Sequence, residues 1–587
     1  MEGENRAARL EELKQQIEEL PVGYISKKNI HNKTRYYRQW TENGKIKSQY
    51  IKEAELTTVE EQIARRKELQ QRLKELEGED PDRRKKTTSR KRASSASKTR
   101  FQMNVLIDEG LRAMTDNICG EERRDGYGKL MDYLNGGEDD RVCLVMGLRR
   151  TGKTTMIRQA ILELVSIGGQ VAYIKATAKD TMPVLSSDLR QLYQAGYRYV
   201  FIDEVTLMDD FIDSAAILSD IHAAQGMRIV LTGTDSLAFF FAMRQELYDR
   251  AVIIHTTFIP FREHSRVLGI HNINDYIRYG GTMRAGGVKQ EDGEINPEHA
   301  SFRDMDSTKE YVDSAVLRNI RRSIACSKDK NQFENLRVLL ENGDLEEMVS
   351  RVIENMNLNF LLLVLSKNTA FHDLRLAVWN LRGDHRREEQ AAGISKTSVA
   401  EIKEVLVAMD LVMECPPETA PSGGELIERV IFIQPGMRYC QIQNLIDSLM
   451  DGERFTSLSE VDKQKLAVQA LELVREQMLE ETIFLETERA MERYHKVYKL
   501  QFNPGDYDMV IYDTKENSCR VCEIRAAQGG AGHYRRMPDA ERYRQIERRF
   551  GNIKDHFILC KDPENQRNDG KRYCRVEDYL RGLSMDN

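Results

Sequence analysis

The sequence has no uninterrupted apolar run that approaches the roughly 18 residues a membrane-spanning helix needs. Its most hydrophobic segments, LAFFFAM at residues 237–243 and FLLLVL at residues 360–365, are short and typical of a protein core. The first residues are acidic and polar, and they lack the apolar stretch of a secretory signal peptide. We therefore expect a cytoplasmic protein that has no membrane among its partners.

The sequence also lacks clusters of cysteine and histidine with the spacing of a zinc site. Its nine cysteines are scattered, which indicates a reducing compartment. The closely spaced pair Cys519 and Cys522 falls in a strand-like segment, where the two thiols would point to opposite faces. The net charge is only −6, so any affinity for nucleic acid would have to come from local basic patches.

The length of 587 residues exceeds what one hydrophobic core supports, and no internal repeat divides the chain. Residues 83–100 are basic and rich in serine, with no apolar content to fold around, and this marks a linker. We predict an appendage at 1–78 with two helices (4–20 and 57–77) around a β-meander, a basic linker at 79–100, an α/β core with a parallel sheet at 101–290, a helical connector at 291–349, a winged-helix-like segment at 350–445 and a further domain at 446–587.

The strongest motif is GLRRTGKTT, which lies between an apolar strand-like segment and a helix-like segment. This is the context that a phosphate-binding P-loop requires. Its glycines let backbone N–H groups face the phosphates, and the helix N-terminus adds a positive end. Lys153 would reach the β- and γ-phosphates of a nucleotide, and the Thr154 hydroxyl would coordinate Mg²⁺. The predicted binding residues are Gly147, Leu148, Arg149, Arg150, Thr151, Gly152, Lys153, Thr154 and Thr155.

A second apolar segment, YRYVFIDEV, ends in the acids Asp203 and Glu204. Asp203 would hold Mg²⁺ through water, and Glu204 would position and polarise an attacking water. A kinase would not need the adjacent Glu204, and no Asn-Lys-x-Asp guanine reader follows. The predicted reaction is therefore hydrolysis of ATP with Mg²⁺.

Two residues farther along the chain are candidates for a supporting role. The segment MRIVLTGTDS predicts a strand with a polar tip, where Thr234 is our choice for a sensor of the γ-phosphate; a simple helix cap is the alternative. Arg250 precedes another strand-like segment, LYDRAVIIH. It fits an arginine finger supplied across the interface of a homo-oligomer, and equally a surface arginine without a catalytic role.

The segment DYDMVIYDTKENSCRVCEIRAA, residues 506–527, predicts two strands joined by a turn. The first strand would place Asp506 and Asp508 on one face, and the second would place Glu523 and Arg525 on one face. Carboxylates about 4 Å apart repel by roughly 4 kcal/mol at an effective dielectric near 20, so such a cluster needs a cation. Either Mg²⁺ or a bidentate salt bridge from Arg525 can supply it.

In order and spacing, the motifs GLRRTGKTT, FIDEV, LTGT, DRA…TTFIPFREH and DYIRYGG resemble those of prokaryotic AAA+ ATPases with an Arg-Arg-x-Gly-Lys-Thr P-loop. The resemblance covers residues 101–587. It implies a multidomain α/β fold with a P-loop NTPase core of the AAA+ type and its parallel sheet, a helical and winged-helix-like middle, and a C-terminal α/β domain of the PD-(D/E)XK nuclease fold, besides the small N-terminal α+β appendage.

The nuclease resemblance implies a second metal site. In that fold a helix acid joins acids on two strands, which corresponds here to Glu480, Asp508 and Glu523. The lysine of the family motif is replaced by Arg525, which cannot act as a base because it keeps its proton. A working nuclease, a lapsed nuclease and a fold of another kind all stay open, and a displaced Lys499 is a candidate to restore activity.

Two segments have the composition of contacts to DNA or RNA. The predicted meander interleaves basic and aromatic residues, which suits phosphate contact and base stacking, although a small core kept soluble by lysines has the same composition. GISKTSVAEIKEVLVAMDLV resembles a recognition helix, yet Glu401 and Glu404 argue against phosphate contact. We therefore carry two functions: an ATPase coupled to nucleic acid, and a nucleotide-switched scaffold that recruits a protein partner.

Overall fold

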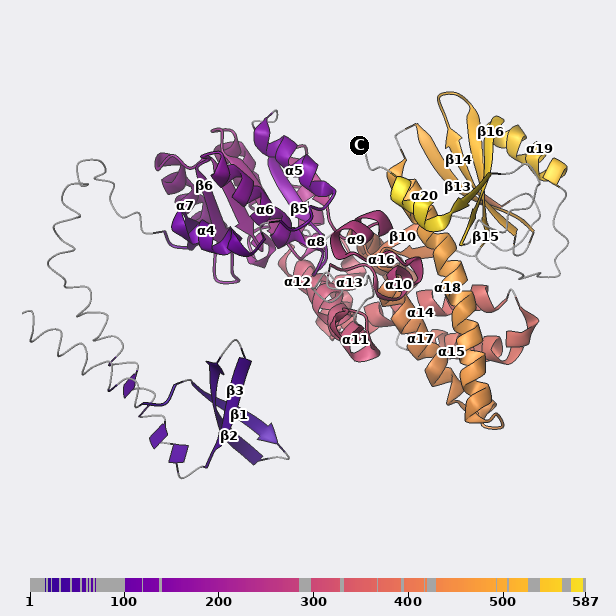
Figure 1. Ribbon diagram of the computed structural model, residues 1–587, viewed down its shortest axis with the longest axis horizontal. Helices are drawn as coiled ribbons and strands as arrows, with labels where there is room; N and C mark the ends of the chain where they lie inside the picture. Colours follow the sequence, from indigo (N-terminus) through magenta and orange to yellow (C-terminus); the bar gives the residue numbers. More distant parts are fainter. Residues whose placement is uncertain are drawn as a thin grey trace, which may run out of the picture. The chain divides into compact units, whose positions relative to one another are not determined.

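The computed structural model divides into two compact units, residues 1–99 and residues 100–587, which we describe separately. In the first unit it describes residues 24–30, 33–42 and 45–52 with a few scattered neighbours; in the second it describes residues 101–583 except 119, 137–139, 284–296, 328–331, 367, 392–394, 416–417, 420–428, 492–493, 504–505, 526–538 and 562–571. Figure 1 shows the labels of many of the elements named below.

The first unit contains the predicted β-meander. Its three strands pair antiparallel in the order β1-β2-β3, and Glu42 of β2 pairs with Lys45 of β3. The rings of Tyr37 and Tyr50 meet edge to face, 5.5 Å apart, on neighbouring strands. The helix predicted at 4–20, most of the one at 57–77, the basic linker and most of the basic and aromatic side chains of the meander lie outside the described residues. The strands are β1 Tyr24–Ile30, β2 Lys33–Glu42 and β3 Lys45–Ile51.

The second unit begins with a six-stranded sheet in the order β4-β6-β7-β8-β5-β9, parallel throughout except at the edge pair β4/β6. The inner strands are buried almost end to end, which explains their continuous apolar sequences. The predicted parallel α/β core is confirmed. Its elements are β4 Asn104–Ile107, α4 Glu109–Thr115, α5 Gly126–Asn135, β5 Val142–Met146, α6 Lys153–Ser166, β6 Val171–Lys175, α7 Met182–Gln194, β7 Tyr199–Asp203, β8 Arg228–Gly233, α8 Ser236–Arg244, β9 Ala251–His255, α9 Phe261–Leu268 and α10 Ile273–Tyr279.

Helices dominate the middle of the chain, and the short strands β10 and β12 pair antiparallel. The winged-helix-like segment at 350–445 stays a prediction. The helix that resembles a recognition helix, α16, serves as a packing element: Glu401 accepts hydrogen bonds from Asn335 Nδ2 (2.5 Å) and the backbone N–H of Leu336 (3.1 Å) at the start of α13. The elements are α11 Met305–Val312, α12 Arg318–Cys326, α13 Glu334–Asn342, α14 Leu345–Leu365, α15 His372–Ala391, α16 Lys396–Ala408, β10 Val412–Cys415, β11 Glu418–Thr419, β12 Arg429–Phe432 and α17 Pro435–Met450.

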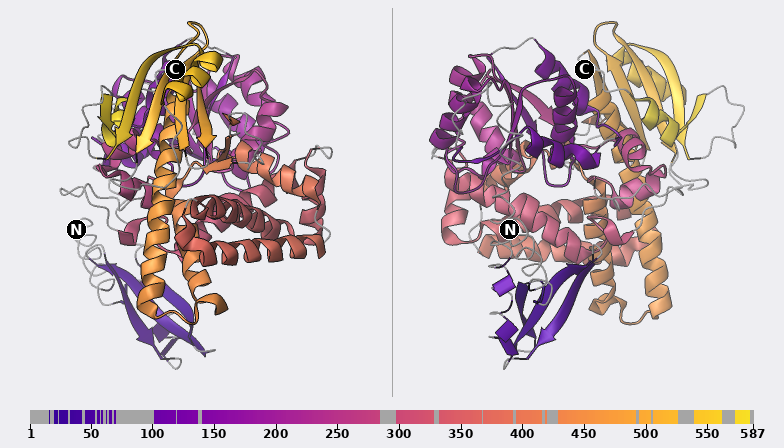
Figure 2. Two further views of the ribbon diagram at one scale, coloured as in Figure 1. Left: turned by 90° about the vertical axis from the view of Figure 1, so that its right-hand side faces the viewer. Right: turned by 60° about the vertical axis from the view of Figure 1, so that its left-hand side comes forward.

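The last part of the chain has a second six-stranded sheet, in the order β11-β13-β14-β15-β16-β17. Strands β13, β14 and β15 form an antiparallel meander, and β16 runs parallel to β15. The long helix α18 contacts β13 and α20, and in Figure 2 it extends well beyond this sheet. The elements are α18 Glu460–Ala490, β13 His495–Asn503, β14 Asp506–Asp513, β15 Ser518–Arg525, α19 Asp539–Phe550, β16 Asn552–Cys560, β17 Arg572–Arg575 and α20 Val576–Gly582.

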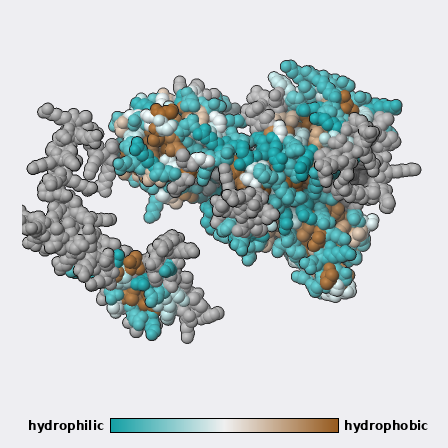
Figure 3. Space-filling view, viewed as in Figure 1, coloured by the Kyte–Doolittle hydropathy of each residue, from teal (hydrophilic) through white to brown (hydrophobic). Residues whose placement is uncertain are grey.

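Both apolar segments noted in the sequence lie in helices of the core. Residues 237–243 belong to α8 and 360–365 to α14, and most of their apolar side chains are buried. Helix α14 contains charged residues and no long uninterrupted apolar run, but it is long and apolar enough to cross a membrane by length and composition. However, 61% of its most apolar window is buried inside the protein, as in a core helix. On the face in Figure 3, most of the described surface is hydrophilic with small separate hydrophobic patches.

Candidate functional site

The glycine-rich loop lies between β5 and α6, as the motif predicts, and its backbone requires glycine at two places. At Gly147, with φ of 153°, an added Cβ would lie 2.3 Å from Thr256 Oγ1 and 2.8 Å from the backbone nitrogen of Thr257. Gly152 precedes α6 in the left-handed region, with φ of 82°. The loop is therefore pressed against the segment after β9, and its shape depends on the absence of side chains.

Lys153 is the first residue of α6 and is buried under the loop. Its Nζ donates to the carbonyl oxygens of Gly147 (2.8 Å) and Leu148 (2.7 Å). Burial lowers the pKa of Lys153 to about 8, and the nearby carboxylates of Glu204 and Asp203 oppose this shift. The positive charge is thus held at the base of the loop, where the phosphates of a nucleotide would lie.

A cavity of about 350 Å³ opens in front of this loop. Its walls combine the loop residues with side chains from two neighbouring strand tips, Glu204 after β7 and Thr234 after β8. Glu204 is held in the left-handed region at φ of 60°, and Thr234 Oγ1 donates a hydrogen bond to its carboxylate (3.2 Å). The lining residues are Arg149, Arg150, Thr151, Gly152, Lys153, Thr154, Thr155, Glu204 and Thr234.

The structure places Asp203 behind the cavity wall, with 1% of its surface exposed. Its carboxylate accepts three hydrogen bonds, from Thr232 Oγ1 (2.5 Å), Tyr173 OH (2.8 Å) and Lys175 Nζ (2.9 Å). Burial alone would raise the pKa of Asp203, but the three donors outweigh burial and lower it. The sequence analysis did not identify Tyr173 and Lys175 as partners of Asp203. Both lie in the apolar segment VAYIK, which forms β6 and pairs with β7 so that Lys175 lies opposite Asp203.

A buried ion pair supports the loop from behind and was also missed. The Arg124 guanidinium contacts both carboxylate oxygens of Glu263, at 2.5 and 3.1 Å. It also donates to the carbonyl oxygens of Thr151 in the loop (2.5 Å), of Thr256 (2.8 Å) and of Phe258 (3.1 Å). Both charged side chains are almost fully buried. Arg124 therefore ties the loop to the segment after β9 and to helix α9.

Arg250 does not reach the cavity of its own chain. It directly precedes β9, and its carbonyl accepts a hydrogen bond from Val142 at the start of β5 (3.0 Å). Because β5 and β9 are parallel, this is the sheet edge opposite to the loop. Its side chain pairs with Asp220 (2.8 Å), and both are largely exposed. A catalytic role for Arg250 would need a second copy of the chain and stays a prediction.

The helical connector touches the tip of β8. Asn319 Nδ2 donates to the carbonyl oxygen of Thr234 (2.8 Å), and Ser323 Oγ donates to Asp235 (2.8 Å). Burial raises the pKa of Asp235 to about 6, although its hydrogen bonds with Ala238 and Ser323 oppose the shift. The residue chosen as a phosphate sensor is thus bonded both to Glu204 and, through its backbone, to α12.

In the C-terminal sheet, the predicted strands β14 and β15 pair so that Asp508 lies opposite Glu523. The Arg525 guanidinium donates to both oxygens of Glu523, at 3.1 and 3.3 Å, and Lys499 pairs with Glu480 at 3.3 Å. The side chain of Asp508 lies outside the described residues. The part of the chain that the structure describes has no group of three acids, histidines or cysteines placed to hold a metal. Cations of the protein thus engage both described acids, and a metal site at Glu480, Asp508 and Glu523 stays a prediction.

The cavity at the glycine-rich loop fits a nucleoside triphosphate with Mg²⁺. Backbone N–H groups at the start of α6 and the Lys153 ammonium suit phosphate oxygens. The Thr154 hydroxyl and the Glu204 carboxylate line the same cavity and provide the hard oxygen ligands that Mg²⁺ and its waters prefer.

Two family models match parts of this chain. One, an AAA domain, matches residues 139–265, which include the loop, Asp203, Glu204, Thr234 and Glu263. The other, a domain of unknown function (DUF6788), matches residues 4–61 and so covers the β-meander. No curated protein matches the chain. The AAA match indicates a nucleotide-binding, ATPase-like function of the P-loop NTPase type.

Proposed function

We propose that the chain hydrolyses ATP at the cavity formed by residues 147–155, Glu204 and Thr234. The observation that carries this proposal is the placement of Glu204, a carboxylate held by Thr234, on the same cavity as Lys153. A cation that binds phosphates and an acid that orients water are the two groups that phosphoryl transfer to water requires.

Each side chain has a separate task in this proposal. Lys153 exchanges its carbonyl partners for the β- and γ-phosphate oxygens, Glu204 orients the attacking water, and Thr234 keeps the Glu204 carboxylate aimed at it. Mg²⁺, when bound through Thr154, neutralises charge on the phosphates. Asp203 acts from behind the wall by fixing Lys175 and the end of β7.

Helix α9 is the proposed route from the nucleotide to the C-terminal part of the chain. Its Glu263 binds Arg124, which holds the loop carbonyl of Thr151. At the start of the same helix, the backbone N–H of Phe261 donates to Glu486 of α18 (2.6 Å). A displacement of the loop during hydrolysis would therefore move α9 against α18, and with it the C-terminal sheet.

Two versions of this function differ in what the C-terminal part of the chain does. The order α18, β13, β14, β15, α19, β16 is that of the PD-(D/E)XK fold implied by the motifs, which supports an ATPase coupled to nucleic acid. The bidentate pairing of Arg525 with Glu523 supports the second version, a nucleotide-switched scaffold with a non-catalytic nuclease-like domain.

Turnover of ATP with and without DNA distinguishes the two versions. For a nucleic-acid-coupled enzyme we expect single- or double-stranded DNA to increase phosphate release several-fold, and Lys153→Ala to abolish it. The same DNA, run on a gel, is expected to stay intact because the Arg525 guanidinium binds both carboxylate oxygens of Glu523. A rate unchanged by every DNA would contradict the coupling and favour the scaffold.

Glu486 gives a pH-dependent test of the contact between α9 and α18. Burial raises its pKa to about 8 from an ordinary value of 4.5, while the N–H of Phe261 and the charge of Arg262 oppose the shift. Because the folded state keeps this proton to a higher pH than the unfolded state, the stability that the protonated Glu486 contributes is fully present below pH 4.5. This contribution is lost as the pH rises towards 8. Glu486→Gln keeps an oxygen for Phe261 but has no proton to lose.

We therefore expect the unfolding free energy of the wild type to fall relative to Glu486→Gln between pH 5 and pH 8, by up to about 1.4 kcal/mol per pH unit. Urea unfolding at several pH values measures the difference. Glu488→Gln, a more exposed acid on the same helix, is the control and should show no such trend. A constant difference between wild type and Glu486→Gln would mean that Glu486 is charged in the fold.

A further inference from the structure

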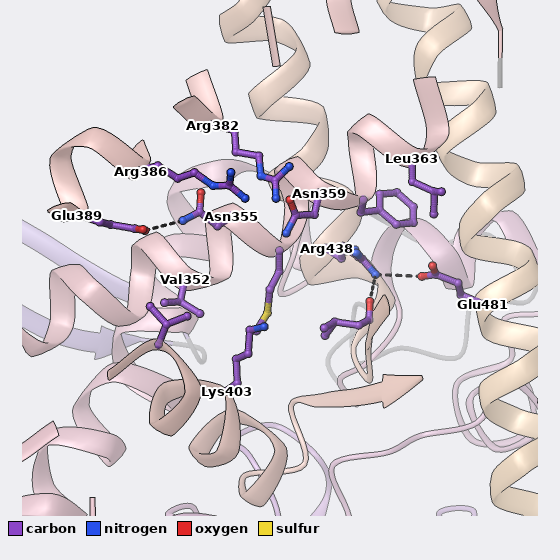
Figure 4. Close-up of a pocket in the computed structure, with 14 residues that line it drawn as sticks. Val352, Asn355, Asn359, Leu363, Arg382, Arg386, Glu389, Lys403, Arg438 and Glu481 are labelled. Carbon is purple, nitrogen blue, oxygen red and sulfur yellow. Dashed lines mark hydrogen bonds and ion pairs between the residues drawn. The ribbon is translucent and has the colours of Figure 1, made fainter. Parts of the chain in front are cut away.

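A second polar cavity, of about 260 Å³, lies among the helices of the middle segment and shares no lining residue with the nucleotide cavity. Helices α14, α15, α16, α17 and α18 and strand β12 all contribute to its wall (Figure 4). The proposed ATPase mechanism gives this cavity no role, and its lining residues lie outside the ranges that the two family models match. Its side chains are unusual for a helical core because four of them are basic.

Three of the basic side chains converge on the cavity from two elements. Arg382 and Arg386 are one helical turn apart on α15 and therefore share a helix face. Lys403 of α16 enters from the opposite side in Figure 4. The Arg386 side chain forms no ion pair with any residue that the structure describes. Like charges at this spacing destabilise a helix, and a bound anion would remove that cost.

Two acids also line the cavity. Glu481 pairs with the fourth basic side chain, Arg438 (3.0 Å), and both are buried. Glu389 accepts a hydrogen bond from Asn355 Nδ2 (2.8 Å). Four basic and two acidic side chains thus line the cavity wall.

The back wall of the cavity also holds polar atoms that have no hydrogen-bond partner among the described residues. The Arg438 guanidinium lies 3.9 Å from the centre of the Phe360 ring, and its Nε is buried without an acceptor in the described part of the chain. The Oδ1 atom of Asn359 is buried without a donor in the same part of the chain. Buried polar atoms of this kind are costly unless a ligand or water satisfies them.

We propose that this cavity binds a phosphomonoester of about mononucleotide size. A phosphomonoester carries about −1.5 to −2 charges near neutral pH and several acceptor oxygens, which suits a wall with more basic than acidic side chains. Arginine pairs bind phosphate oxygens with their planar forks, so Arg382 and Arg386 would hold the phosphate together with Lys403. A donor group on the rest of the ligand would satisfy Asn359.

Calorimetric titration of the full chain tests the proposal, with AMP, adenosine and inorganic phosphate as probes. Lys153→Ala serves as the background because it removes phosphate binding at the glycine-rich loop. We expect AMP to bind this background as it binds the wild type, and adenosine to bind at least about tenfold more weakly. A 5′-phosphorylated and a 5′-hydroxyl oligonucleotide show whether the phosphomonoester comes from a small molecule or from a strand end.

Two variants locate the site. Arg386→Gln and Lys403→Gln should each weaken AMP binding about tenfold, because each removes a charged donor. Arg387→Gln is the matched control: this neighbouring arginine is exposed and pairs with Asp384 outside the cavity, so it should leave binding unchanged. The proposal is overturned if no probe binds the Lys153→Ala background, or if Arg386→Gln and Lys403→Gln bind AMP as tightly as Arg387→Gln does.

Discussion

Glu204→Gln is expected to reduce ATP turnover by about 10²- to 10⁴-fold while leaving nucleotide affinity within a few-fold of the wild type. The amide oxygen can still accept the hydrogen bond from Thr234. However, the amide is neutral and cannot polarise the attacking water as the carboxylate does. The phosphate contacts of residues 147–155 are unaffected, so the variant should hold ATP without cleaving it.

Phosphate release and binding of a fluorescent ATP analogue, measured on the same preparations, check this expectation. Lys153→Ala should lose binding as well as turnover, and Glu246→Gln, a partly exposed acid of the same domain that does not line the cavity, should keep both. If Glu204→Gln turned over ATP at the wild-type rate, Glu204 would not orient the water, and the role would have to pass to another side chain.

Glu263→Ala is expected to destabilise the protein by about 3–5 kcal/mol, because it leaves Arg124 buried without its carboxylate. Urea unfolding measures the loss. Glu122→Ala is the matched control: its ion pair with Arg266, at 3.8 Å, is exposed, and its removal should cost under about 1 kcal/mol. Equal effects of the two substitutions would show that the buried pair does not support the fold.

A double variant separates stability from nucleotide binding at the same place. Arg124→Met with Glu263→Leu removes both buried charges together, so most of the lost stability should return. Nucleotide affinity should nevertheless stay at least tenfold below that of the wild type, because the loop carbonyl of Thr151 has lost its donor. Recovery of wild-type affinity in the stable double variant would mean that Arg124 does not hold the loop in its binding shape.

The sequence was sufficient to predict the elements whose signals are local. The strand and helix on either side of the glycine-rich loop, the meander at residues 24–51 and the strand pair β14/β15 all have short-range periodicity or turn signals, and each is present. The P-loop identity of the core followed from the spacing of its motif, and the AAA match covers the same residues. Local sequence patterns were therefore sufficient to predict these helices, strands and the glycine-rich loop.

Contacts between distant segments could not be predicted in the same way. Arg124 lies in EERRDGYG, where nothing distinguishes it from the preceding Arg123, and its partner Glu263 is 139 residues away. Lys175 became a partner of Asp203 only because β6 pairs with β7 in the sheet. Ion pairs of this kind depend on register and packing, which one sequence does not determine.

The C-terminal sheet is an intermediate case. The sequence placed Glu523 and Arg525 on one strand and left open whether Mg²⁺ or the arginine compensates the acids. The structure has the arginine in that position, 3.1 Å from Glu523. Residue spacing alone could not decide this, because both arrangements satisfy the same alternation of side chains.

The measurement that tests the central claim most directly is Mg²⁺-dependent phosphate release from ATP by the purified chain, beside Lys153→Ala. The proposed function predicts steady release by the wild type, loss of release when EDTA removes the metal, and no release by Lys153→Ala. Equal background rates for the two proteins, with ATP bound equally by both, would contradict an ATPase site at this loop.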